Sequence, residues 1–183
     1  MIFKETPLKG AYTIELNPFI DNRGLFARTF CKNEFLAIGH DKEFVQFNHS
    51  VTHKKGSIRG MHYQLPPFSE VKLIRCIRGK VFDVIIDLRK NSPTFLNHHF
   101  VELSENNMLS LYIPQGFAHG FQTLEDNTQL IYHHTAYYCP DYEAGIRYDD
   151  PALGISWSLP VSTITEKDLN YNLLKNSFKG ISI

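Results

Sequence analysis

The sequence has no excess of either charge. Lys and Arg together number 19, Asp and Glu also number 19, and no block of basic residues occurs. Proteins that bind nucleic-acid backbones usually carry a clear basic surplus, so the composition argues against a nucleic-acid partner. Any anionic ligand must therefore be bound by a local cluster of Lys and Arg.

The sequence is also poor in cysteine and in long apolar segments. Its three cysteines, Cys31, Cys76 and Cys139, are scattered and form no Cys-x-x-Cys pair, so neither a disulfide framework nor a zinc site is indicated. No stretch approaches the roughly 20 apolar residues that cross a bilayer. The first residues, MIFKETPLKGAYTIEL, show no signal-peptide pattern. We therefore expect a cytoplasmic protein without a membrane segment.

What the sequence does contain is a globular composition with many short apolar segments. Hydrophobic residues make up 43% of the 183 residues, which suits one domain spanning 1–183. Short segments separated by Gly, Pro, Asn and Asp are typical of β-sandwiches and barrels. We predict strands at 11–16, 44–51, 57–64, 71–78, 80–88, 99–103, 108–113, 117–123 and 128–136, with a hairpin turn at Gly79. Helical signals are confined to 32–38 and to a short turn that Thr165 would cap, so we predict an all-β barrel with small peripheral helices.

One predicted strand carries a charge at an unexpected position. In VKLIRCIR (71–78), a period of two places Lys72 on one face with Ile74 and Cys76, and both faces are largely apolar. The strand therefore lies between two layers. A Lys facing the barrel interior needs a partner or a task, because a buried unpaired ammonium is costly. The alternative is that Lys72 sits at the barrel mouth and reaches water.

Two histidines stand on apolar, glycine-punctuated stretches, His62 in RGMHYQ and His119 in PQGFAHGF. The segment from Gly56 to Glu70 resembles the first metal motif of cupins, which are small jelly-roll β-barrels, and PQGFAHGF resembles the second. Gln64 replaces the second histidine of the first motif, and neutral Gln is a poor substitute for imidazole on a transition metal. We therefore favour a metal-free site over a metal held by His62, His119 and Glu70. A third interpretation is that both histidines are buried for packing.

Further stretches match a single family in order and spacing. They are DNRGLF (21–26), FVQFNHS (44–50), RGMHYQLPP (59–67), VKLIRCIRGKVFDVIIDLRKNSPTF (71–95), LYIPQGFAHGF (111–121), YYCPDYEAGIRYDDPALGISW (137–157) and TEKD (165–168). They resemble the metal-free cupin family of dTDP-4-dehydrorhamnose 3,5-epimerases and related nucleotide-sugar 3-epimerases. The resemblance implies a cofactor-independent isomerase in deoxysugar biosynthesis. Its substrate would be a nucleoside-diphosphate 4-keto-6-deoxyhexose, inverted at carbon 3, with or without carbon 5, through an enolate.

The resemblance also implies the catalytic residues. His62 corresponds to the base, Asp168 to the carboxylate that orients it, Tyr132 to the acid and Lys72 to the cation that stabilises the enolate. A carboxylate fixes the tautomer of an imidazole. A phenol, with an ordinary pKa near 10, stays protonated at neutral pH, and an ammonium stabilises a developing oxyanion. His119 would line the sugar pocket.

For the rest of the substrate, the resemblance implies a second group of binding residues. Besides Lys72 and His119, these are Arg23, Phe26, Arg28, Gln46, Asn48, Arg59, Tyr138, Glu143 and Lys167. Guanidinium groups of Arg23 and Arg59 suit a diphosphate, and Tyr138 would stack on the base. In the family, Arg23 and its neighbours come from the second subunit. The resemblance therefore implies a homodimer with shared sites, and it implies no metal or cofactor.

Several positions depart from the family pattern. Arg28 stands where Glu is usual, Phe47 replaces an acidic residue, Glu70 replaces a neutral residue, and Tyr148-Asp149 stands where Trp-Asn is usual. The first two suggest the hypothesis that the base of the nucleotide is not thymine, so that the substrate would be a cytidine diphosphosugar or another nucleoside diphosphosugar. The alternative is that Arg28 faces solvent and dTDP still binds.

Three other functions remain open from the sequence. One is a nucleotide-sugar 3,4-ketoisomerase, which would use the same enolate and return the proton elsewhere. The second is a metal-dependent cupin enzyme. The third is a non-catalytic module that binds sugar nucleotides, although mere binding needs neither the base His62 nor the acid Tyr132.

Overall fold

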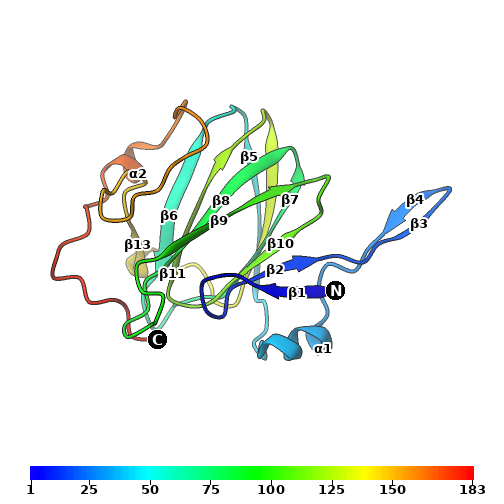
Figure 1. Cartoon of the computed structure of the whole chain (residues 1–183), viewed down its shortest axis with the longest axis horizontal. Helices are drawn as coiled ribbons and strands as arrows, with labels where there is room; N and C mark the ends of the chain where they lie inside the picture. The colour runs from blue at the N-terminus through cyan, green and yellow to red at the C-terminus, as the bar shows by residue number, and fades with distance from the viewer.

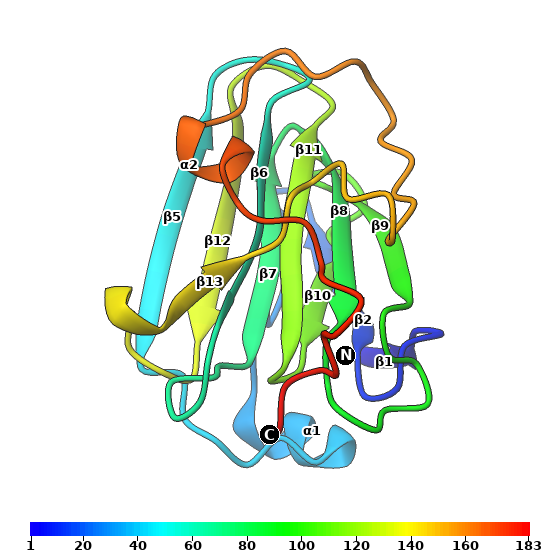
Figure 2. The same cartoon turned by 90° about the vertical axis from the view of Figure 1, so that its left-hand side faces the viewer.

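A computed structural model describes residues 1–183, and strands dominate it. Two antiparallel sheets face each other (Figures 1 and 2). The six-stranded sheet has the order β1 (Ile2–Glu5), β2 (Tyr12–Glu15), β10 (Ser110–Ile113), β7 (Lys72–Arg78), β12 (Thr128–His134), β5 (Gln46–Thr52). The five-stranded sheet has the order β13 (Glu143–Gly145), β6 (Ile58–Gln64), β11 (Phe117–Thr123), β8 (Lys80–Asp87), β9 (His98–Ser104). This arrangement confirms the predicted all-β, cupin-like jelly roll.

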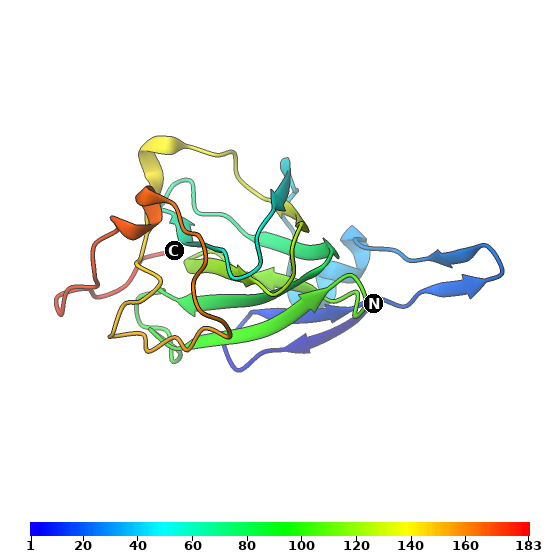
Figure 3. The ribbon, with the colours of Figure 1, turned by 90° about the horizontal axis from the view of Figure 1, so that it is seen from above.

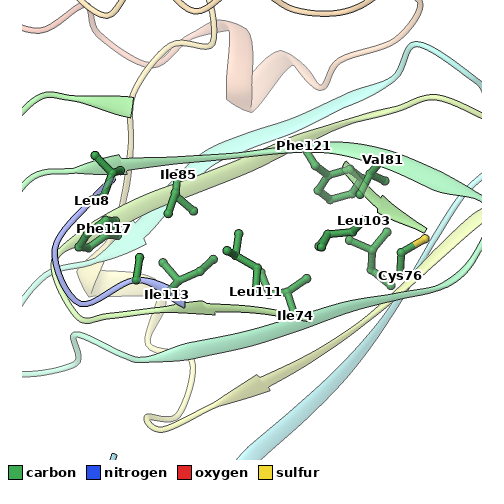
Figure 4. Close-up of a cluster of buried hydrophobic side chains, with 12 residues drawn as sticks. Leu8, Ile74, Cys76, Val81, Ile85, Leu103, Leu111, Ile113, Phe117 and Phe121 are labelled. Atoms are coloured by element: carbon green, nitrogen blue, oxygen red, sulfur yellow. The ribbon is translucent and has the colours of Figure 1, made fainter. Parts of the chain in front are cut away.

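The main core fills the space between the two sheets. Ile74 and Leu111 come from the six-stranded sheet, and Val81, Ile85 and Phe121 come from the five-stranded sheet (Figure 4). All five side chains are almost completely buried, at 0 or 1% exposure. The period-two prediction for 71–78 is confirmed, because one face of β7 joins this core while its other face packs in a separate apolar cluster. Burial at both faces explains why strands β7 and β8 read as nearly continuous apolar runs.

The predicted helical turns are confirmed. Helix α1 (Lys32–Phe35) continues as the 3-10 turn η1 (Leu36–Ile38) and ends at Gly39, whose φ of 75° is left-handed. Helix α2 (Glu166–Leu169) begins at Thr165, whose hydroxyl accepts a hydrogen bond from the Asp168 N–H. A third short turn, η2 (Pro140–Tyr142), was not predicted. None of these helices is long and apolar enough to span a bilayer.

Two strands that the sequence did not predict form an arm. Strands β3 (Phe19–Asp21) and β4 (Gly24–Phe26) pair only with each other and project from the barrel (Figures 1 and 3). Their apolar side chains, Phe19 and Phe26 among them, are more than half exposed. Because neither face of this hairpin is buried, the arm shows no alternation of apolar and polar residues. Strands β1 and β13, at the sheet edges, were missed because they have only four and three residues.

Candidate active site

A cavity of about 360 Å³ lies between the inner faces of the two sheets, and α2 borders it. The residues expected from the sequence that line this cavity are Asn48, Arg59, His62, Lys72, His119, Tyr132, Lys167 and Asp168. They come from β5, β6, β7, β11, β12 and α2, so residues distant in sequence converge on one space. The structure therefore brings together all four residues that the resemblance assigns to catalysis.

His62 and Asp168 form a hydrogen-bonded pair. His62 Nε2 lies 2.7 Å from Asp168 Oδ1, and the second carboxylate oxygen accepts the Gly60 N–H at 3.2 Å. The Thr165 cap fixes the first turn of α2, and the bonds of Asp168 to Gly60 and His62 hold this turn against β6. Gly60 has a φ of +119°, and a Cβ there would stand 2.6 Å from the Cα of Gly120. Glycine is therefore required where β6 and β11 approach each other.

The environment of Asp168 keeps its carboxylate ionised. Burial raises the pKa of Asp168, but the hydrogen bond and charge of His62 and the Gly60 N–H outweigh burial, so the pKa lies below its ordinary value. A carboxylate can only accept hydrogen bonds, so His62 Nε2 carries the proton. The other ring nitrogen, Nδ1, has no hydrogen-bond partner in the chain and is free to act as a base.

His119 forms a second imidazole–carboxylate pair deeper in the barrel. Its Nε2 lies 2.9 Å from one oxygen of Asp83 and 3.0 Å from the other, and both residues are buried. Burial raises the pKa of Asp83 and lowers the pKa of His119, so the surroundings disfavour charge on either group. Asp83 was not predicted, although a carboxylate inside the apolar run of 80–88 signals a buried partner.

Lys72 faces the cavity and is only 8% exposed. Its ammonium forms an ion pair with Glu70 at 3.2 Å and approaches the His62 carbonyl oxygen at 3.4 Å. The alternative in which Lys72 reaches out to water is therefore wrong. The charge on this strand has a partner in Glu70, and Lys72 lines the same cavity as His62.

Tyr132 lies on β12, in the sheet that faces His62. Its ring contacts those of His119, edge-on with centroids 6.1 Å apart, and His134, stacked at 6.0 Å. Burial raises the pKa of the Tyr132 phenol, and the carboxylate of Asp83 raises it further, while Arg59 opposes the shift. The phenol is therefore held in its protonated form, as a proton donor requires.

A polar cluster at the rim of the cavity gathers several of the residues expected to bind the nucleotide. Glu143 accepts hydrogen bonds from the Tyr138 hydroxyl at 2.7 Å and from Lys167 at 2.6 Å. Gln46 accepts the backbone N–H of Tyr138 at 2.9 Å. Arg59 is anchored by Thr52 and by a backbone carbonyl, and its side chain borders the cavity. These contacts place aromatic, acidic and cationic groups at one opening.

Three expected residues lie apart from this chain's own cavity. Arg23 and Phe26 are on the β3–β4 arm, where Arg23 pairs with Asp21. Arg28 follows the arm, and its side chain is 64% exposed in an ion pair with Glu34, which also binds the amino terminus. In the single chain Arg28 therefore faces solvent, which agrees with the second of the two alternatives for this residue.

Gln64 explains why the cupin metal motif is altered here. Its amide nitrogen donates to Glu70 at 3.0 Å and to the backbone of Phe68 at 3.0 Å, and its oxygen accepts the Cys139 N–H at 2.7 Å. The side chain therefore clamps the 137–139 segment to β6. His62 Nε2 and His119 Nε2 each face a carboxylate of their own, and no group of three potential metal ligands occurs.

Tyr171 is a contact of His62 that the sequence did not indicate. Its ring meets the imidazole edge-on at 5.9 Å, and it packs so closely on Gly145 that a Cβ there would stand 2.3 Å away. Its buried hydroxyl has no partner. Only the fold could reveal this neighbour, because it depends on how the segment after α2 crosses β13.

Comparisons with known proteins agree with this geometry. The family model for dTDP-4-dehydrorhamnose 3,5-epimerase matches residues 5–176. The chain is 41% identical to the dTDP-4-dehydrorhamnose 3,5-epimerase of Shigella flexneri, covering 91% of this chain and 92% of that protein. It is 42% identical to that of Methanothermobacter thermautotrophicus, covering 96% and 95%.

Solved structures of such enzymes have the same fold. The Bacillus anthracis enzyme, with TDP and pyrophosphate bound, superposes with a TM-score of 0.91 at 38% identity, covering 94% of this chain and 99% of that one. The Legionella pneumophila enzyme, in complex with dTDP-4-keto-L-rhamnose, superposes with a TM-score of 0.92 at 35% identity, covering 100% and 98%.

Proposed function

The chain belongs to the family of dTDP-4-dehydrorhamnose 3,5-epimerases, and we propose how the residues of its cavity carry out the family's reaction. It is an isomerase that inverts carbon 3 of a nucleotide-linked 4-keto-6-deoxyhexose. We further propose that the nucleotide is dTDP and that carbon 5 is inverted as well. Relatives near 40% identity carry the 3,5-epimerase name, whereas a 3'-monoepimerase from Streptomyces bikiniensis is 31% identical.

The observation that carries the mechanism is the placement of base and acid on facing sheets. His62 lies on β6 of the five-stranded sheet, Tyr132 lies on β12 of the six-stranded sheet, and both line one cavity. Sheets that pack face to face are separated by about 10 Å, which leaves room for a sugar ring between the two side chains. Inversion requires proton removal from one face of a carbon and proton return to the other, and this arrangement supplies both.

The proposed reaction uses the free nitrogen of His62. Nδ1 takes the proton from carbon 3, and the electron pair of that C–H bond moves to the neighbouring ketone, whose oxygen becomes an enolate. The Lys72 ammonium stabilises the negative oxygen. Tyr132 then gives its phenolic proton to carbon 3 from the opposite face, and the carbonyl re-forms. The imidazolium and the phenolate return to their resting forms by exchanging one proton with solvent, so the cycle balances.

The relatives crystallised with TDP and with dTDP-4-keto-L-rhamnose support dTDP as the nucleotide, and the local charges suit a nucleoside diphosphate. The arginine at position 28, which reverses the family's usual charge, is balanced by Glu34 within the chain. The rim cluster of Tyr138, Glu143 and Lys167 provides an aromatic surface for the base and a cation for the diphosphate. Arg59 extends the cationic groups into the cavity. Because charged nucleotide sugars do not cross membranes unaided, we place the enzyme in the cytoplasm.

We also propose that the β3–β4 arm completes the cavity of a second copy of the chain. The arm exposes apolar side chains, and it presents Arg23 far from the cavity of its own chain. In a homodimer of two single-domain chains, the partner subunit's Arg23 would bind the diphosphate. Arg23→Ala should then weaken dTDP binding about tenfold, a typical loss for one charge-assisted hydrogen bond, while kcat changes little. Equal dTDP affinity by calorimetry would contradict this role.

Turnover in D₂O tests the proposed function. Purified protein is incubated with a dTDP-linked 4-keto-6-deoxyhexose, and NMR reports configuration and deuterium content at each carbon. Deuterium at carbons 3 and 5 with inversion at both is the expected result, and label at carbon 3 alone would limit the enzyme to that position. A product whose keto group has moved would identify a ketoisomerase and contradict the proposal. Parallel titration with dTDP, CDP, UDP and GDP should show preferential binding of dTDP.

A further inference from the structure

A buried carboxylate next to the cavity has no role in the reaction as described so far. Glu70 immediately precedes β7, and its side chain is only 9% exposed. One oxygen forms the ion pair with Lys72 at 3.2 Å. The other accepts hydrogen bonds from Gln64 at 3.0 Å and from His134 Nδ1 at 3.2 Å. A carboxylate this buried and this fully bonded occupies one defined position.

The contacts of Lys72 show what that position does. An ammonium has three N–H groups. Glu70 engages one, and the backbone carbonyl oxygen of His62 on β6 lies 3.4 Å from the same nitrogen. The chain offers Lys72 no other acceptor, so one N–H remains for an oxygen inside the cavity. These contacts hold the flexible Lys72 side chain in one conformation, so its remaining N–H has a fixed direction.

His134 ties Glu70 to the inner wall of the six-stranded sheet. His134 and Lys72 are register partners on β12 and β7. Because a carboxylate only accepts, His134 Nδ1 carries the proton, and its Nε2 lies 3.4 Å from the amide nitrogen of Asn48 on β5. Burial raises the pKa of Glu70, but Lys72 and His134 outweigh burial and lower it below its ordinary value. Glu70 therefore stays ionised between two donors.

We propose that Glu70 is a positioning residue for the epimerase reaction, which holds the Lys72 ammonium against the enolate oxygen and does not itself touch the substrate. This inference rests on the proposed function of Lys72. It assigns Glu70 an effect on enolate formation but not on nucleotide affinity. A residue needed only for folding would affect both together.

A double-mutant cycle separates the two roles. Glu70→Gln keeps the side-chain volume but removes the charge that attracts the ammonium. In the wild-type background we expect deuterium exchange at carbon 3 to slow about tenfold, less than the hundredfold or more that loss of an oxyanion donor costs. In a Lys72→Met background the same change should slow exchange less than about twofold, because coupled residues are not additive. The affinity for dTDP should be unchanged in every variant.

The chain offers a matched control in Lys80 and Glu102, an ion pair at 3.3 Å whose Glu102 side chain is 52% exposed. Glu102→Gln should leave exchange within about twofold of wild type, as expected for a surface pair. If Glu70→Gln does not fold, Glu70→Asp keeps the charge but withdraws the carboxylate by one methylene, so the Lys72 ammonium should lose its position and exchange should slow at unchanged dTDP affinity.

Equal losses in both backgrounds, or weaker dTDP binding in step with slower exchange, would overturn the role of Glu70. A wild-type protein that exchanges no deuterium would overturn the proposed function instead. An active wild type in which Glu70→Gln exchanges at the normal rate would overturn the positioning role alone.

Discussion

The two walls of the cavity are built in different ways. On the five-stranded sheet, the predicted base His62 is paired with Asp168 of α2, which lies outside both sheets, whereas His119 is paired with Asp83 of the adjacent strand β8. On the six-stranded sheet, the polar groups come from two adjacent strands, because Lys72 pairs in register with His134 and Ile74 with Tyr132. The predicted base on the five-stranded sheet therefore depends on a group from outside both sheets, whereas Lys72 and Tyr132 on the six-stranded sheet are positioned by pairing between adjacent strands. We call the two sides the base wall and the acid wall.

This difference has a chemical counterpart. On the base wall, the carboxylate of Asp168 fixes the tautomer of the His62 imidazole, so the pair can take up and release a proton. On the acid wall, burial holds the Tyr132 phenol protonated and Glu70 fixes the Lys72 ammonium. Changes on the first wall should abolish proton removal, whereas changes on the second should alter where the proton returns or how stable the enolate is.

The largest effect should follow from removing the base. His62→Asn keeps a hydrogen-bond donor toward Asp168 but supplies no basic nitrogen. We expect deuterium exchange and inversion to fall together by about a thousandfold, within the range of general acid–base catalysis. Dialysis with dTDP should show unchanged binding. Deuterium exchange at the wild-type rate in this variant would contradict the assignment of His62 as the base.

A somewhat smaller effect should follow from changing the partner of the base. Asp168→Asn presents an amide that can donate to His62 Nε2, which favours the tautomer with the proton on Nδ1. The base would then be blocked, and exchange should fall about a hundredfold. Nitrogen NMR of labelled histidine measures the tautomer directly. An unchanged tautomer together with a large loss of rate would show that Asp168 acts in another way.

The smallest effect concerns pH on the acid wall. The pKa of Tyr132 is raised above its ordinary value, so the folded protein retains this proton where an unfolded chain loses it. No phenolate from Tyr132 should therefore appear below about pH 10, the ordinary tyrosine pKa. Stability should decline as the pH rises past that value, because the unfolded state then binds fewer protons. The ultraviolet difference between wild type and Tyr132→Phe measures the ionisation, and phenolate at pH 9 would contradict it.

The barrel and its core could be predicted from the sequence, because the alternation of apolar and polar residues indicates which side chains of a strand are buried and turn residues indicate where a strand ends. Every predicted segment overlaps an observed strand. Period two placed Lys72 on the same face as Ile74 and Cys76, but only the structure shows that its side chain lines the cavity. The β3–β4 arm could not be predicted, because neither of its faces is buried in one chain and its apolar residues follow no pattern.

The candidate site also has a part that could be predicted from the sequence and a part that could not. The resemblance pointed to His62, Tyr132, Lys72 and Asp168, and the structure brings them to one cavity. Periodicity alone would not have paired His62 with Asp168, because that contact depends on the position of a four-residue helix. The role of Glu70 was also hidden, since its partners become neighbours only when β7, β12 and the segment before β7 are packed.

The separation of base and acid onto opposite walls is tested most directly with Tyr132→Phe in D₂O. NMR follows deuterium entry at carbon 3 and the configuration of that carbon in one reaction. Exchange should continue within about fivefold of wild type, because His62 still removes the proton, while inversion falls about a hundredfold. Inversion at the wild-type rate, or loss of exchange together with inversion, would contradict the placement of the acid on the six-stranded sheet.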